Sequence, residues 1–306
     1  MANLKELAKQ GEKFLGGHRA CAGCGATIVA RQVLLAAQYP VVVGAATGCL
    51  EVVSTIFPYS AWNVPYIHNA FENVAATMAG VEAAYNALKR KGKIDKDIRF
   101  IAFGGDGGTY DIGLQSLSGM IERRHRVLYV CYNNEAYMNT GIQRSSATPY
   151  GAHTTTSPAG TVIPGKLQPR KNLTEIIIAH EPAYAAQATI GYWNDLVTKV
   201  RKALDAEGPS FINVFSPCRL GWAYPPEKTI EITKLAVETC VWPLYEYENG
   251  KYRITVKPKD KKPIEEFLKL QGRFTHLFKL KDQTPIKEFQ AEVDRIWERL
   301  LKRSGE

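Results

Sequence analysis

The sequence lacks any apolar run long enough to cross a bilayer. Of its 306 residues, 45% are hydrophobic and 23% are charged. Every apolar stretch is shorter than the roughly 20 residues that a membrane-spanning helix needs. The N-terminal segment, MANLKELAKQGEKF, has no apolar core of the signal-peptide kind. We therefore expect a cytoplasmic globular protein, large enough to bury a sizeable core and not bound to a membrane.

Acidic residues are too few to balance the basic ones. Lys and Arg total 39 against 30 Asp and Glu, which gives a formal net charge of +9. Much of the excess lies in residues 123–126 (RRHR) and 251–262 (KYRITVKPKDKK). No basic-aromatic module of RNA-binding type accompanies them, and there is no zinc-finger spacing. We expect a solvated or subunit-facing basic surface and no nucleic-acid partner, while an acidic protein partner stays open.

The sequence also lacks the second close-spaced cysteine pair that zinc sites usually have. Cys21 and Cys24 form the one C-x-x-C pair, whereas Cys49, Cys131, Cys218 and Cys240 stand singly. A disulfide framework is not expected in a cytoplasmic protein. Metal ligation, redox chemistry and plain burial are the alternatives that remain.

What the chain does contain is an alternation of short apolar runs with helical patterns. Apolar runs bounded by Gly, Asn and Asp are typical of buried parallel strands, and their alternation with helices predicts a doubly wound, mostly parallel α/β sheet. The expected strands are 39–45, 98–104, 127–132, 184–190 and 210–215, and the expected helices are 27–37, 71–91, 111–124, 172–180 and 193–206. The aromatic segment 58–69 and the polar segment 139–168 are expected to be loops.

The pattern changes from about Thr229. Residues 242–257 predict a hairpin with Asn249-Gly250 as a type I′ turn, and 263–270 and 285–301 predict helices. We expect residues 1–228 to form the α/β domain. Residues 229–306 would then form a C-terminal extension that packs on this domain or on partner subunits.

Two of the expected strands end in loops that carry oxygen ligands. The run Gly104–Gly108 (GGDGG) follows one strand, and Asn133-Asn134 follows the next. The carboxyl ends of neighbouring parallel strands meet at the edge where α/β sheets bind ligands. Glycine lets a phosphate approach the backbone, and Asp and Asn offer the hard oxygens that Mg²⁺ prefers. We predict a diphosphate held through one Mg²⁺ ion near Asp106 and Asn134; ordinary turns are the alternative.

Four cysteines fall in expected loops near that same edge. Cys49 and Cys218 each follow a strand, and Cys21 and Cys24 precede a helix. Four converging thiolates suit a [4Fe–4S] cluster, and separate buried thiols are the alternative. Cys131 lies inside an apolar strand and Cys240 lies in the extension, so we expect both to be structural.

Five stretches together resemble the β subunit of pyruvate:ferredoxin oxidoreductase, one of the 2-oxoacid:ferredoxin oxidoreductases. They are HRACAGCG (18–25), TGCLE (47–51), WNVPYIHNAF (62–71), GGDGGTYDIG (104–113) and YMNTGIQ (137–143). The resemblance implies that Asp106, Asn134 and the Ala136 carbonyl bind Mg²⁺. It also implies that Cys21, Cys24, Cys49 and Cys218 hold a [4Fe–4S] cluster. In the same way, Asn139 would lie near the thiazolium ring and substrate, and Thr47, Gly105, Gly107 and Thr140 would line thiamine diphosphate.

The resemblance also implies a reaction and a set of partners. Pyruvate would be oxidatively decarboxylated with coenzyme A to acetyl-CoA and CO₂, with electrons passing through the cluster to ferredoxin. The partners would be the alpha, gamma and delta subunits, and the alpha subunit would contribute the pyrimidine-binding domain and its Glu. The acidic residues near the loops, Glu51, Glu72 and Glu135, are therefore expected to be structural, as is His68.

Three other interpretations of the function remain open. The same chemistry on 2-oxoisovalerate or oxalate is the first alternative, because substrate contacts would come largely from the partner. A decarboxylase without electron transfer would leave the four cysteines unexplained. The alternative of another class is a zinc-binding interaction subunit with the GDG loop as a plain turn.

Overall fold

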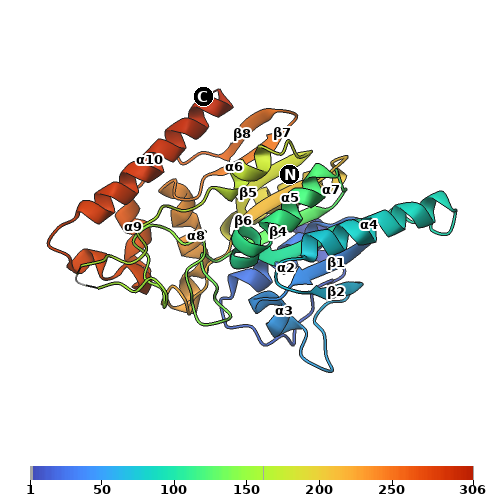
Figure 1. The fold of residues 1–306 in the computed structure, drawn as a ribbon, viewed down its shortest axis with the longest axis horizontal. Helices are drawn as coiled ribbons and strands as arrows, with labels where there is room; N and C mark the ends of the chain where they lie inside the picture. The colour runs from blue at the N-terminus through green and yellow to red at the C-terminus, as the bar shows by residue number, and fades with distance from the viewer. Residues whose placement is uncertain (1–2, 161, 306) are drawn as a thin grey trace.

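A single eight-stranded sheet organises the chain in this computed structural model, which describes residues 3–160 and 162–305. The strand order is β2-β1-β3-β4-β6-β5-β7-β8 (Figure 1). The strands are β1 (Val41–Ala46), β2 (Tyr66–Asn69), β3 (Arg99–Gly105), β4 (Leu128–Asn133), β5 (Tyr184–Thr189), β6 (Ser210–Phe215), β7 (Leu244–Glu248) and β8 (Lys251–Val256). Strands β1 to β6 pair in parallel, and β7 and β8 are antiparallel. The expected mostly parallel α/β sheet is confirmed.

Helices cover both faces of this sheet. They are α1 (Leu4–Ala8), α2 (Gly25–Ala36), α3 (Cys49–Ser54), α4 (Val74–Arg90), α5 (Leu114–Glu122), α6 (Leu173–Ile178), α7 (Trp193–Asp205), α8 (Thr229–Glu238), α9 (Ile264–Lys269) and α10 (Thr284–Ser304). Alternate residues of the strands face opposite layers, as the two-residue period of a strand requires. In β4, Val130 packs with the layer of α2 and α7, and Tyr129 packs with the layer of α4, α5 and α6.

Two segments differ from the sequence-based expectation. The segment 58–69 was expected to be a loop, but its end forms β2, which pairs with β1 and makes one edge of the sheet. The helix expected at 111–124 is preceded by a π-helix, Gly107–Ile112, and the α-helix begins only at Leu114. The long polar segment 139–168 contains isolated bridges and no helix or strand among its described residues, as predicted.

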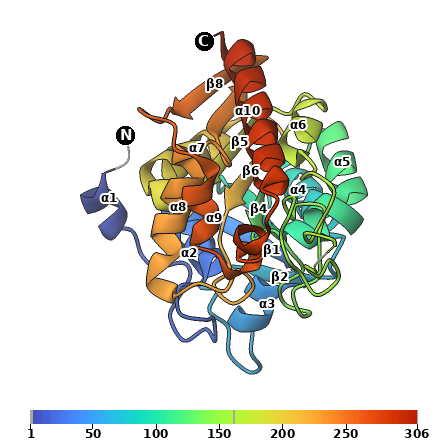
Figure 2. The same cartoon turned by 90° about the vertical axis from the view of Figure 1, so that its left-hand side faces the viewer.

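The C-terminal extension completes the sheet rather than lying on its surface. The predicted hairpin is present, and Asn249 and Gly250 both have the positive φ that a type I′ turn requires. Its first strand, β7, pairs with β5, so the extension continues the hydrogen-bonded ladder of the α/β domain. Helices α8, α9 and α10 lie together at one end of the molecule (Figure 2). They share a hydrophobic core with Phe215 of β6.

Within the described residues, we find no helix that is both long and apolar enough to span a membrane.

Trp242 anchors the extension to the sheet. Its ring stacks on Phe215 with the ring centroids 5.0 Å apart, and its indole N–H donates to the Ala188 carbonyl at 2.9 Å. We expect Trp242→Ala to lower the free energy of unfolding by about 3–5 kcal/mol, because it leaves a cavity and an unsatisfied carbonyl. Urea denaturation measures this. Phe57→Ala is the control, since Phe57 is 94% exposed and its loss should change stability by less than about 0.5 kcal/mol. Equal effects of the two substitutions would contradict the prediction.

Candidate cofactor site

A cavity of about 190 Å³ opens where β1, β3 and β4 end. Strand β2 lies on one side of β1 and strand β3 on the other, so the strand order reverses here, and ligands bind at such switch points in α/β sheets. The lining residues include all eight that sequence analysis assigned to the cofactor: Thr47, Gly105, Asp106, Gly107, Asn134, Ala136, Asn139 and Thr140. The structure therefore brings together residues that lie up to 93 positions apart (47 to 140) in the chain. Cys49 also lines this cavity.

Asp106 is almost completely buried at the start of the π-helix. The Asn134 backbone N–H donates to its Oδ1 at 3.1 Å, and the Ser145 hydroxyl donates to its Oδ2 at 2.6 Å. Burial nevertheless raises the pKa of Asp106 to about 7, and the nearby negative charge of Glu135 contributes to the rise. A divalent cation beside this carboxyl group would favour its charged form and lower that pKa.

Asp106 Oδ1 is one of three oxygen atoms that converge at this point. The side-chain oxygen of Asn134 lies 2.8 Å from the Ala136 carbonyl oxygen and 2.9 Å from Asp106 Oδ1, with no proton between them. If the Asn134 amide were turned over, its nitrogen would donate a hydrogen bond to each of these two oxygen atoms. In the present orientation, a cation bound to all three oxygen atoms would offset the repulsion between them. Oxygen ligands at adjacent corners of an octahedral Mg²⁺ site lie about 2.9 Å apart, because Mg–O bonds are roughly 2.0–2.1 Å long. With its oxygen in the present orientation, Asn134 therefore makes two distances that match adjacent ligands of a magnesium ion.

Close packing explains the glycines of the GDGG loop. A Cβ atom on Gly107 would lie 2.5 Å from the Tyr137 ring, and one on Gly108 would lie 2.7 Å from the Phe71 carbonyl oxygen. Neither glycine has a positive φ. These positions therefore exclude larger residues by lack of space, and they let the π-helix lie against the loop that carries Tyr137.

Thr47 is positioned by the end of β2. Its hydroxyl oxygen lies 2.9 Å from His68 Nε2 and 3.0 Å from the Asn69 carbonyl oxygen. The carboxylate of Glu51 accepts the Thr55 hydroxyl at 2.9 Å and lies 3.6 Å from His68 Nε2. His68 therefore contacts a residue that lines the cavity, without lining the cavity itself.

The four loop cysteines gather next to this cavity. Cys24 caps α2, Cys49 begins α3, and the Gly25 N–H donates to the Pro217 carbonyl at 3.3 Å, which joins the loops of Cys24 and Cys218. Burial is the first cause that raises the pKa of the Cys49 thiol to about 12, and the negative charges of Cys218, Cys24 and Cys21 contribute to this rise. Each of the other three is thus close enough to affect the charge of Cys49. Cys131 and Cys240 are buried, as expected.

No group of three or more His, Cys, Asp or Glu side chains surrounds a point where a single metal ion would fit, within the part of the chain that the structure describes. In a [4Fe–4S] cluster each thiolate binds a different iron atom, so the four sulfur atoms stand farther apart than around one ion.

Comparison with known proteins agrees with this geometry. Residues 46–214 match the family described as thiamine pyrophosphate enzyme, C-terminal TPP binding domain. Pyruvate synthase subunit PorB of Thermotoga maritima is 60% identical over 309 residues, which cover 98% of this chain and 95% of that protein. The PorB subunit of Methanocaldococcus jannaschii is 60% identical over 268 residues, which cover 87% of this chain and 90% of that protein. The chain belongs to the pyruvate synthase subunit PorB family.

Two further proteins, one compared by sequence and one by structure, are similar to this chain. Ketoisovalerate oxidoreductase subunit VorB of Pyrococcus abyssi is 48% identical over 293 residues, which cover 95% of this chain and 93% of that protein. A solved 2-oxoglutarate:ferredoxin oxidoreductase from Magnetococcus marinus superposes with a TM-score of 0.57 at 22% identity, over 71% of this chain and 69% of that one. The second similarity supports the fold alone. PorB-family membership makes residues 46–214 a thiamine diphosphate-binding domain of the oxidoreductase class.

Sequence analysis missed the ion pairs beneath the PorB-family cavity. Glu135, which was expected to be structural, is fully buried and pairs with both Arg170 and Arg273. Asp111 accepts the Tyr137 hydroxyl at 2.8 Å and the Ser146 N–H at 3.2 Å. The NNEAY context of Glu135 is the one local signal. It does not identify Arg170 and Arg273, because these partners come from distant segments.

Gly108 tests whether close packing shapes the cavity. Gly108→Ala would force the new methyl group against the Phe71 carbonyl, so we expect the free energy of unfolding to fall by about 1–3 kcal/mol. The matched control is Gly80→Ala, because Gly80 is exposed in α4 and a Cβ there would have nothing within 4 Å. Gly80→Ala should be neutral or stabilising by up to about 1 kcal/mol. Urea denaturation of both variants checks the difference, and a stable Gly108→Ala protein would refute it.

Proposed function

We propose that this chain is the thiamine diphosphate- and cluster-binding subunit of a pyruvate:ferredoxin oxidoreductase complex. The observation that carries the proposal is that the Asn134 side-chain amide meets Asp106 Oδ1 and the Ala136 carbonyl oxygen at the cavity. These atoms would hold Mg²⁺, and Mg²⁺ would hold the diphosphate against the Gly105–Gly107 backbone. Thr47, Asn139 and Thr140 line the rest of the cavity, where the ring and substrate would lie.

Thiamine diphosphate, when bound, supplies an electron sink for the loss of CO₂ from a 2-oxoacid. The residues of this chain would position it, keep the Asp106 carboxyl charged through the metal, and limit access of water. Gly107, packed against Tyr137, leaves room for the backbone to approach the diphosphate. Asn139 would contact the thiazolium ring and substrate.

We further propose that Cys21, Cys24, Cys49 and Cys218 hold a [4Fe–4S] cluster. Burial is the first cause that raises the pKa of Cys49 and of Cys218, and a bound metal would favour the thiolate form of both. Cys49 belongs to both sites, because it lines the cofactor cavity and lies near the other cysteines. The cluster would therefore accept electrons across one wall of the cavity and pass them to ferredoxin.

This chain would supply only half of the active site. Among the described residues that line the cavity, Asp106 is the one carboxylate; its Oδ1 would bind magnesium, and its Oδ2 accepts from the Ser145 hydroxyl. A Glu for the aminopyrimidine ring would have to come from another subunit. We therefore propose a complex with alpha, gamma and delta subunits, in which alpha brings the pyrimidine-binding domain, with coenzyme A as acetyl acceptor.

Ferredoxin reduction by the purified complex tests the substrate. We expect reduction with pyruvate and coenzyme A, and no activity from this chain without its partners. The similarity to a ketoisovalerate oxidoreductase subunit makes 2-oxoisovalerate the second candidate, and oxalate completes the panel. One or two extra methyl groups are worth about tenfold or more in kcat/KM, so the panel separates these substrates. Preference for 2-oxoisovalerate would move the assignment to that substrate, and activity of the isolated chain would overturn the half-site model.

Metal content tests the cluster. We expect Cys218→Ser to lower the iron and sulfide content and to abolish the visible and paramagnetic signals of the cluster. Cys240→Ser is the control, because Cys240 is likewise a free cysteine but lies buried in the extension. Equal iron in both variants would refute the ligand assignment. Zinc alone in the parent protein would favour the zinc-binding interaction subunit instead.

A further inference from the structure

Glu135 separates the two residues that place the magnesium oxygens, Asn134 and Ala136. Its side chain is fully buried, and its backbone has a φ of +65°, which non-glycine residues rarely adopt. The Thr148 hydroxyl donates to its carbonyl at 2.6 Å, and its own N–H donates to Asn133 Oδ1 at 3.0 Å. The backbone turn that brings the Asn134 and Ala136 oxygens together is thus centred on a buried charge.

Arg273, from the C-terminal extension, neutralises that charge. Its Nη2 donates to Glu135 Oε2 at 2.6 Å, across 138 positions of sequence. The Gln271 side-chain oxygen accepts from its Nε at 2.9 Å and from its Nη2 at 2.8 Å. Arg273 is 4% exposed, so this ion pair is shielded from water and salt.

Arg273 also contacts the metal loop by a second route. Its guanidinium lies over the Trp222 ring, 3.7 Å from the ring centroid. The Trp222 indole N–H donates to the Asn134 carbonyl at 2.8 Å, and its backbone N–H donates to the Cys218 carbonyl at 2.9 Å. The Arg273 guanidinium therefore acts on the metal loop in two ways. Through Trp222 it orders Asn134, the residue before the turn, and through Glu135 it orders the turn itself.

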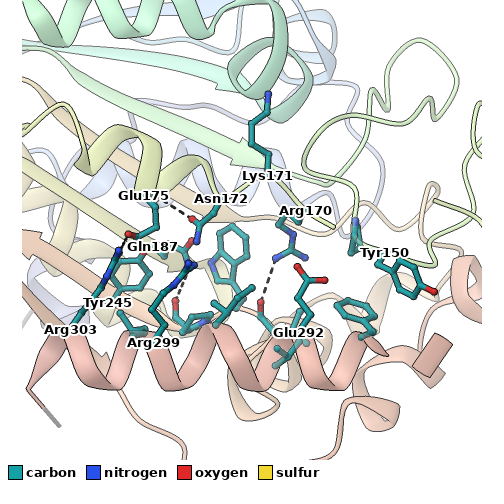
Figure 3. A pocket seen from close by; sticks show the side chains of 18 of the residues that line it. Tyr150, Arg170, Lys171, Asn172, Glu175, Gln187, Tyr245, Glu292, Arg299 and Arg303 are labelled. Atoms are coloured by element: carbon teal, nitrogen blue, oxygen red, sulfur yellow. Dashed lines mark hydrogen bonds and ion pairs between the residues drawn. The ribbon is translucent and has the colours of Figure 1, made fainter. Parts of the chain in front are cut away.

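Arg170 does not duplicate this role. It pairs with the other oxygen of Glu135 but also donates to the Ala147 carbonyl at 3.2 Å and to the Val241 carbonyl at 3.4 Å. Figure 3 shows Arg170 in the pocket between the core and the helix that carries Glu292, Arg299 and Arg303. With its hydrogen bonds divided among these groups, Arg170 is not placed to replace Arg273.

We propose that Arg273 is a positioning residue for the magnesium ion, acting on Asn134 and Ala136 through Glu135 and Trp222. This inference rests on the proposed function, because it presumes the metal at these oxygens. It makes the C-terminal extension part of the cofactor site. Residues that orient metal ligands typically change metal affinity by roughly 10–100-fold when they are removed.

Arg273→Met, in the assembled complex, tests the proposal. The readout is the concentration of Mg²⁺ required for thiamine diphosphate binding, with Mn²⁺ as a spectroscopic probe of the same site. We expect roughly 10–100-fold weaker metal binding, and a smaller loss for Arg273→Lys, which keeps the charge without the planar fork. The matched control is Lys199→Met, which removes an equally buried cation that pairs with Asp195 in α7. That variant should lose stability but keep its metal affinity.

The outcomes separate the two proposals. If the parent complex binds no Mg²⁺ with thiamine diphosphate, the proposed function fails. If the parent binds both and Arg273→Met matches Lys199→Met in metal affinity, the positioning role is overturned. Should Arg273→Met fail to assemble, Glu135→Gln decides, since it keeps the shape of the side chain and removes only its charge. Roughly tenfold weaker metal binding supports the role, and unchanged binding overturns it.

Discussion

The parallel register of β3 and β4 is the constraint on which the cofactor cavity depends. Gly105 lies beside Tyr132 across the ladder, so Asp106 and Asn134 leave the sheet almost side by side. Hydrogen bonds to Asp106 from Asn134 and Ser145 then hold a carboxyl group that burial alone would keep protonated near neutral pH. A shift of one residue in this register would turn one side chain to the opposite face and separate the oxygens.

The sequence predicted the features that depend on local pattern and strand ends. Apolar runs that end in Gly, Asp or Asn placed Asp106 and Asn134 at one edge, because parallel strands can end there only together. The same argument placed Cys49 and Cys218 near that edge. The Asn249-Gly250 turn was predictable because few residue pairs adopt two positive φ angles in succession.

The remaining features depend on contacts that local sequence does not encode. The hairpin pattern predicts that β7 pairs with β8. It does not predict which strand of the larger sheet β7 will join, and in the structure that strand is β5. Gly107 and Gly108 of the π-helix pack against Tyr137 and Phe71, which lie elsewhere in the chain. The Glu135–Arg273 pair joins segments 138 positions apart. In the sequence, nothing distinguishes Arg273 from the other basic residues of the extension, so the pair could not be predicted.

These non-local contacts change how the extension relates to the site. A surface arm would leave the metal loop to be ordered by the α/β domain alone. Here the extension closes one edge of the sheet through β7 and places Arg273 beneath the loop, so the burial of Glu135 depends on both parts. Without Arg273, Arg170 would be the one cation paired with the buried Glu135 carboxylate, which would then be less well neutralised beside Asp106. On the proposed role of Arg273, the turn between Asn134 and Ala136 therefore depends on the folded extension as well as on the α/β domain.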